Sequence, residues 1–214
     1  MTGTVVEVGI GGTTPQATGT RWRWDLAVYY AQIKDEILSI EAIDPGTGLP
    51  TGTSLSANVD DTIHAGLEAL VGASFDLGGD RHRLEPLLSL TLNEFSFDSD
   101  PAYGNNDLPA APTYAARGEL IYRHASGFYA GPTFDFIGKR YVDFANTTDV
   151  DSYQLLGFRC GISGKTWEVF GELRNVTDED YIATFSVLNQ ATGNDAIYLP
   201  GAPRAAYVGA RIGF

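Results

Sequence analysis

The sequence predicts an all-β protein, an antiparallel transmembrane β-barrel of about nine strands. Apolar and polar residues alternate over stretches of ten residues or more, and short connections between the stretches alternate with long ones. Aromatic residues gather beside the short connections. Strands that cross a bilayer at a tilt have about this length, and outer-membrane barrels combine short periplasmic turns, long extracellular loops and aromatic girdles.

The clearest alternation runs through residues 62–76, where apolar side chains from Ile63 to Phe75 share one face. Eight further stretches repeat the pattern, the first two less regularly than the others. The nine predicted strands are residues 4–10, 22–40, 62–76, 84–93, 114–123, 128–136, 153–162, 167–174 and 206–214. The long connections are residues 41–61, 98–112, 139–151 and 175–205.

Charged residues fall on the polar faces of these strands, which we expect to line the barrel lumen. Such charges are expected to pair across neighbouring strands. The predicted lumen-facing charges are Glu68, Glu85, Glu119, Asp135, Glu168, Glu172, Arg117, Arg123, Arg159, Arg174 and Arg211. Cys160 is predicted to face lipid, and the acidic stretches 143–151 and 177–180 are predicted to be solvated loops rather than cation sites.

The composition argues against several kinds of function. The 214 residues include 14 Lys and Arg against 27 Asp and Glu, a net charge of −13, which opposes a nucleic-acid partner. His64, His82 and His124 have no nucleophile beside them and are predicted to be polar surface or lumen residues, so we expect no enzyme. The sequence has no cluster of Cys and His residues that would indicate a metal or cofactor. It also has no stretch of about 18 apolar residues that would indicate a transmembrane helix.

A count of nine strands is odd, whereas a closed barrel with both ends in the periplasm needs an even number. An open edge in lipid would leave backbone N–H and C=O groups unpaired. We therefore expect the chain to be part of a larger barrel. Two alternatives stay open: an autonomous barrel of eight or ten strands, porin-like or adhesin-like, and a soluble secreted β-sandwich that binds a ligand.

The order of several short motifs resembles the C-terminal part of TonB-dependent outer-membrane receptors. The stretches 167–181 (WEVFGELRNVTDEDY) and 198–204 (YLPGAPR) precede a last strand that ends in Phe. The residues that match these family motifs are Asn175, Asp178, Tyr181, Pro200, Gly201, Pro203 and Arg204. The resemblance implies that residues 1–214 form part of one barrel domain, about strands 14 to 22 of a 22-stranded barrel. The family's plug, TonB-contacting segment and signal peptide are expected to be absent from the chain.

The resemblance also implies a location and partners. The protein is expected to lie in the outer membrane, in contact with its lipid, and to take up a scarce small molecule such as a ferric siderophore or cobalamin. The TonB–ExbB–ExbD complex would energise uptake through the plug, so this chain alone is not expected to couple energy. The barrel-assembly machinery would recognise the last strand through apolar side chains at every second position, which are Phe214, Ile212, Ala210 and Val208.

Overall fold

The computed structural model describes residues 1–15, 19–48, 50–79, 81–191 and 197–213, and most of them lie in β-strands. No helix among these residues is long and apolar enough to cross a membrane.

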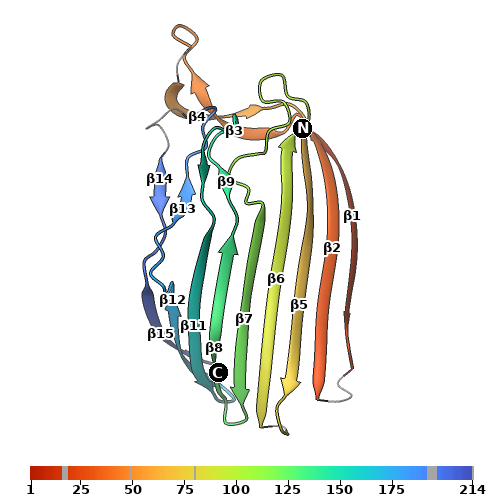
Figure 1. The fold of residues 1–214 in the computed structure, drawn as a ribbon, viewed down its shortest axis with the longest axis vertical. Helices are drawn as coiled ribbons and strands as arrows, with labels where there is room; N and C mark the ends of the chain where they lie inside the picture. The colour runs from red at the N-terminus through yellow and green to blue at the C-terminus, as the bar shows by residue number, and fades with distance from the viewer. Residues whose placement is uncertain (16–18, 49, 80, 192–196, 214) are drawn as a thin grey trace.

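Nine strands form one sheet in which each strand pairs antiparallel with the next along the sheet (Figure 1). In sheet order they are β1 (Thr2–Thr13), β2 (Thr20–Lys34), β5 (Thr62–Asp76), β6 (His82–Phe97), β7 (Tyr114–His124), β8 (Phe128–Ile137), β11 (Tyr153–Ser163), β12 (Trp167–Arg174) and β15 (Ala205–Ile212). The prediction of about nine antiparallel strands is therefore confirmed. Because β1 and β15 stand at the two edges of the sheet, these strands do not close into a barrel.

The connections separate the sheet into two ends. At the turn end, short connections join β1 to β2, β5 to β6, β7 to β8 and β11 to β12. At the loop end, near the top of Figure 1, the long connections include three small antiparallel pairs. These pairs are β3 (Ile37–Ile43) with β4 (Pro50–Asn58), β9 (Arg140–Tyr141) with β10 (Asp149–Val150), and β13 (Ile182–Phe185) with β14 (Tyr198–Pro200).

The prediction of one strand over residues 22–40 is wrong. Strand β2 ends at Lys34, and Asp35 has a φ of 50°, in the left-handed region that turns the chain out of the sheet. Residues 37–43 form β3, which pairs with β4 instead of with the large sheet. Alternation continues through the break because β3 also has two unlike faces, so the pattern alone does not reveal the change of partner.

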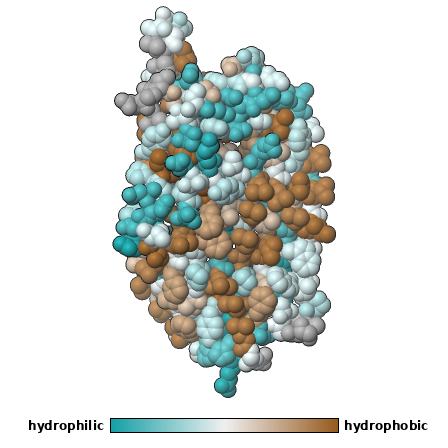
Figure 2. All heavy atoms as spheres, viewed as in Figure 1, coloured by the Kyte–Doolittle hydropathy of each residue, from teal (hydrophilic) through white to brown (hydrophobic). Residues whose placement is uncertain are grey.

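The register places the apolar residues of neighbouring strands in common rows. One row crosses five strands through Leu26, Ala69, Leu90, Ala116 and Phe136. Hydrophobic side chains accordingly gather over the strands in Figure 2, whereas hydrophilic ones are concentrated towards the loop end. This face is the predicted lipid-facing side, since an apolar band is what hydrocarbon accommodates.

Several strand glycines lie directly opposite an aromatic residue of the next strand. Phe134 stands opposite Gly118, Tyr129 opposite Gly161, and Phe170 opposite Gly209. A Cβ atom at residue 161 would lie 2.7 Å from the Tyr129 ring, and one at residue 209 would lie 2.5 Å from the Phe170 ring. The rings therefore occupy the space that a side chain at the glycine position would take. They cover the backbone that the glycine leaves exposed.

Neighbouring residues near the middle of β6 offer a test of the two faces. Leu90→Lys places an ammonium group on the lipid side and is expected to destabilise the barrel that contains this sheet by about 2–4 kcal/mol. Thr91→Lys, one residue away on the lumen side, is expected to cost less than about 1 kcal/mol. Urea unfolding of the detergent-solubilised barrel measures both, and equal costs would contradict the assignment of the faces.

Candidate functional site

A cavity of about 610 Å³ opens at the loop end, among segments that are far apart in the sequence. Strands β3 and β4 form one side of it, and the ends of β5 and β6 contribute His64 and Phe95. The long connections after β6, β8 and β12 supply the rest. Its lining residues are Glu36, Leu38, Ser39, Glu41, Gly52, Thr53, Ser54, His64, Phe95, Leu108, Pro109, Ala111, Phe144, Ser186, Val187, Leu188 and Ile197.

A small hydrophobic core supports this cavity from within the loop end. Phe97, Leu108 and Phe144 are buried together, and the rings of Phe97 and Phe144 lie 5.7 Å apart, centroid to centroid. Tyr103 stacks on Phe97 with ring centroids 5.4 Å apart. Burial raises the pKa of the Tyr103 hydroxyl, and the nearby carboxylates Asp100 and Asp143 raise it further. The core joins the end of β6 to the long connections after β6 and β8, so it holds these walls of the cavity in place.

Glu36 organises the polar side of the cavity. Its carboxylate oxygen Oε2 accepts a hydrogen bond of 2.5 Å from the hydroxyl of Thr62, which is fully buried, and lies 3.0 Å from Nε2 of His64. The His64 ring also lies against Phe95, with centroids 4.5 Å apart. The prediction that His64 is a polar surface or lumen residue missed this partnership, since Glu36 is 28 residues away in the sequence.

Asp143 anchors two of the long connections to each other. It is 0% exposed and accepts hydrogen bonds from the backbone N–H of Thr147 at 2.9 Å, of Thr148 at 3.2 Å and of Ala191 at 2.8 Å. The Thr147 hydroxyl donates to the same carboxylate. The prediction of a solvated acidic loop over residues 143–151 is therefore wrong for Asp143. Its carboxylate is buried because it accepts hydrogen bonds from backbone N–H groups that need a partner inside the fold.

The family-motif residues of the sequence converge just beyond the end of β12. The Asn175 side chain is the centre of this group: its Nδ2 donates to the carbonyl oxygens of Glu179 at 2.9 Å and Ala202 at 3.2 Å, and its Oδ1 accepts from Glu179 N–H at 2.8 Å. Asn175 is 4% exposed and has a φ of 50°, a backbone conformation that asparagine tolerates better than most residues. It thus ties both ends of the connection between β12 and β15.

The other motif residues extend the same anchor. The Asp178 carboxylate accepts from the backbone N–H of Arg204 at 2.9 Å. The N–H of Gly201 donates to the Tyr181 carbonyl at 2.8 Å, and the Tyr181 ring lies where a side chain at residue 201 would stand. Pro200 ends β14, and Pro203 lies in the segment that leads into β15.

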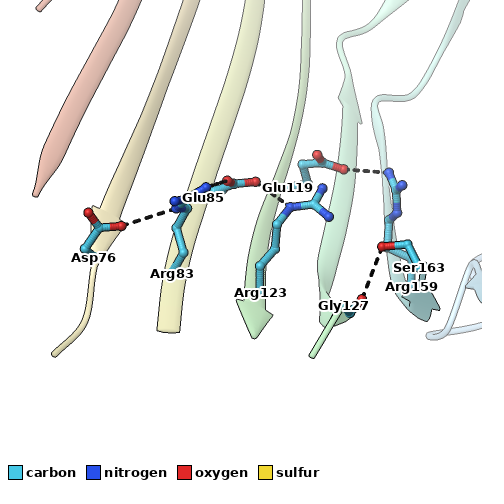
Figure 3. A network of polar contacts seen from close by, with 8 residues as sticks. All are labelled: Asp76, Arg83, Glu85, Glu119, Arg123, Gly127, Arg159 and Ser163. Atoms are coloured by element: carbon cyan, nitrogen blue, oxygen red, sulfur yellow. Dashed lines mark hydrogen bonds and ion pairs between the residues drawn. The ribbon is translucent and has the colours of Figure 1, made fainter. Parts of the chain in front are cut away.

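Charged residues form a ladder on the lumen side towards the turn end (Figure 3). Arg123 Nε lies 2.6 Å from Glu85, and Arg159 Nη1 lies 3.0 Å from Glu119. Arg159 and Glu119 belong to strands separated by β8, which has Gly131 opposite Arg159. Further pairs join Arg83 to Asp76, Arg117 to Asp135, Arg174 to Glu172 and Arg211 to Glu168. The predicted pairing across neighbouring strands is confirmed for Arg117, Arg123 and Arg211. Arg159 instead pairs across β8, and Arg174 pairs within its own strand. No ion pair is present for Glu68 among the described residues.

Two predicted sites have separate outcomes. His82 and His124 stand directly opposite each other on β6 and β7 with ring centroids 5.1 Å apart, a juxtaposition that the sequence alone did not indicate.

In the last strand, Val208, Ala210 and Ile212 lie on β15 at every second position, and the Val208 and Ile212 side chains are exposed. Phe214 lies outside the described residues, and recognition of this strand by the assembly machinery stays a prediction.

Comparison with known proteins gives a consistent result. The model of the family described as TonB dependent receptor-like, beta-barrel, matches residues 1–176. No curated protein matches the chain. Among solved structures, the ferric citrate transporter FecA in unliganded form is similar over 98% of this chain and 31% of its own, with a TM-score of 0.69 and 18% identity.

Two further structures share the fold. The ferric yersiniabactin uptake receptor FyuA from Yersinia pestis is similar over 99% of this chain and 30% of its own, with a TM-score of 0.65 and 17% identity. The copper transporter OprC is similar over 99% of this chain and 31% of its own, with a TM-score of 0.64 and 15% identity. The chain thus spans about a third of the length of these structures.

Asn175→Ala removes three hydrogen bonds that involve the Asn175 side chain and is expected to destabilise the barrel by about 2 kcal/mol. The backbone groups of residues 179 and 202 would lose buried partners, so the connection should also become sensitive to protease. Urea unfolding and limited proteolysis measure these effects. The control is Val176→Ala, at a neighbouring exposed position, where a change below about 0.5 kcal/mol is expected; an equal loss in both variants would contradict the anchor.

Asp143→Asn replaces one acceptor oxygen by an NH₂ group that faces other N–H donors. We expect a loss of about 2 kcal/mol and faster amide hydrogen exchange at Thr147, Thr148 and Ala191. Asp149→Asn is the matched control, because Asp149 is partly exposed and its one ion pair among the described residues is with Lys139, 3.4 Å away at the surface. Unchanged exchange at all three amides in Asp143→Asn would contradict the role of this carboxylate.

Proposed function

Because the chain belongs to the TonB-dependent receptor family, whose β-barrels are outer-membrane proteins, we propose that it forms part of a receptor for uptake of a scarce small molecule. The observation that carries the proposal is the cavity of about 610 Å³ among the long connections. It lies at the loop end, opposite the short turns, where the outer-membrane orientation of such barrels faces the cell exterior. A cavity of this size suits a small organic molecule or a metal chelate.

The names of the similar structures support a metal or a metal chelate as the class of cargo. FecA is described as a ferric citrate transporter, FyuA as a ferric yersiniabactin uptake receptor and OprC as a copper transporter. We propose a related nutrient for this receptor, such as a ferric siderophore or cobalamin. Its capture at the loop end would precede transport through the barrel.

The open sheet supports the further proposal that this chain supplies only part of the barrel. Strand β1 pairs with β2 on one side and has no strand on its other side among the described residues, and β15 likewise has one neighbour. Each unpaired backbone group in lipid costs several kcal/mol, so additional strands are needed to satisfy both edges. We propose that these strands, and a plug in the lumen, belong to the same receptor.

The lumen face suits such a plug. It bears the ion-pair ladder of Figure 3, and these side chains are only partly buried, so polar groups remain available to a domain in the lumen. Energy from the TonB–ExbB–ExbD complex would reach the receptor through that plug. The barrel-assembly machinery would then insert this chain only together with the other strands of the complete barrel.

A segment exchange tests these proposals. In a bacterial strain without FecA, this chain replaces the matched 31% of FecA, and the rest of FecA supplies the plug and the other strands. The chimaera is expected to reach the outer membrane and to migrate faster on a gel before boiling than after it, as folded barrels do. It should also support growth on at least one supplied iron chelate, copper chelate or cobalamin, only when TonB is present.

The 214-residue chain with a cleavable leader is the comparison. Expressed alone, it is expected to give no heat-modifiable band in the outer membrane, because its edges remain unpaired. A heat-modifiable monomer from the chain alone would favour the autonomous small barrel instead. A folded chimaera that shows no TonB-dependent uptake of any supplied nutrient would contradict the receptor function.

A further inference from the structure

The negative charge of the protein is concentrated at the loop end. Among the described residues, the four connections there, within 35–61, 98–113, 138–152 and 175–204, contain 15 acidic residues but only 3 basic ones. The described strands and short turns contain 10 acidic and 11 basic residues. The excess of negative charge in the described chain therefore lies at the loop end, whereas the strands and turn end are nearly balanced.

The three basic residues of these connections do not offset that charge inside the cavity. Lys139 pairs with Asp149 at 3.4 Å, and Arg204 donates to Asp178. Arg140 is 7% exposed, and its guanidinium donates to the backbone carbonyl groups of residues 182 and 183 at 2.8 and 3.1 Å. None of the three lines the cavity.

The cavity itself contains two carboxylates, one imidazole and, among the described residues, no lysine or arginine. Glu36 is engaged by Thr62 and His64. Glu41 differs: its backbone is bonded to the Asn189 side chain in both directions, at 3.3 and 3.0 Å. Its carboxylate, however, has no hydrogen bond or ion pair to any residue that the structure describes. Even with His64 protonated, the cavity would remain negative.

The remaining lining decides what kind of molecule this charge favours. Leu38, Phe95, Leu108, Phe144 and Leu188 present apolar surface beside the two carboxylates. A ligand that fills such a cavity removes water from Glu41, which costs free energy unless the ligand offers a cationic or hydrogen-bonding partner. An anionic ligand would leave Glu41 unpaired and would also meet the repulsive potential of the loop end.

We infer that the ligand of this cavity has an apolar body and a positive charge, and that the Glu41 carboxylate pairs with that charge. The inference rests on the proposed receptor function and specifies its class of ligand. It separates this chain from a receptor for an anionic chelate such as ferric citrate, for which a cationic site is expected. The negative loop end would attract the ligand from solution, and the apolar walls with Glu41 would retain it.

Two dyes with the same xanthene ring system test the inference: rhodamine 6G, a cation, and fluorescein, an anion. Fluorescence polarisation measures the binding of each to the chimaera with FecA in non-ionic detergent. Rhodamine 6G is expected to bind at least about tenfold more tightly than fluorescein, with an affinity that falls as salt is raised. Equal affinities for the two dyes would overturn the inference.

Glu41→Gln removes the charge and retains the shape, and it should fold normally because the Glu41 carboxylate has no partner in the described chain. We expect it to weaken rhodamine 6G binding about tenfold. Asp60→Asn, an exposed residue outside the cavity, removes the same charge from the same connection and should change binding less than about twofold. An unchanged affinity in Glu41→Gln, or equal losses in both variants, would overturn the role of Glu41.

Heat-modifiable migration verifies the folding of each variant before binding is measured. If the exchange into FecA does not fold, the same exchange into FyuA, over the 30% of that chain which matches, provides the barrel. Binding in detergent needs neither TonB nor transport. If a chimaera binds the cation selectively but shows no TonB-dependent uptake, the result counts against the proposed function alone. If it binds the anion selectively, the result counts against the inference alone.

Discussion

The pairing of backbone N–H and C=O groups is the constraint from which the rest of this structure follows. In hydrocarbon no water can replace a missing partner, so a spanning strand has to be hydrogen-bonded to a neighbour on both sides. The nine strands meet this requirement by pairing with their neighbours from β1 to β15, except at the two outer edges. Continuous pairing also forces every side chain onto one of two faces. The apolar row from Leu26 to Phe136 and the ion-pair ladder on the opposite face are consequences of that geometry.

Beyond the sheet, the long connections satisfy the same requirement with side chains. Asp143 accepts hydrogen bonds from backbone N–H groups of two connections, and the Asn175 side chain is hydrogen-bonded to both ends of the connection between β12 and β15. Both residues are buried polar groups that have several partners, which is the condition under which burial stabilises a fold. The two anchors and the core of Phe97, Leu108 and Phe144 give the loop end a defined shape, although little of it belongs to the large sheet.

The sequence predicts the sheet far better than the loop end, for a physical reason. Alternation reports which face a side chain occupies, and this was sufficient for the strands and for the pairing of residues such as Arg117 with Asp135. Alternation does not report which strand is the partner, so the sequence predicts one strand over residues 22–40 where the structure has β2 and β3. The Glu36–His64 contact and the burial of Asp143 depend on connections that meet only in three dimensions, and no local pattern marks them. The motif residues near Asn175 were found through resemblance, whereas their hydrogen bonds required the structure.

The separation between a rigid frame and a charged cavity explains how this chain can share a fold with receptors of different cargo. The sheet, the aromatic residues over glycines and the loop anchors contribute to stability, and none of them requires a particular ligand. Among the cavity residues, Glu41 is held through its backbone, so its side chain can change in charge without loss of the pairing between β3 and β4. A preformed cavity loses little entropy on binding, so the charge and apolar surface of its lining determine which molecules remain bound. Selectivity in such a receptor can therefore change at a few cavity residues while the backbone pairing that spans the membrane stays the same.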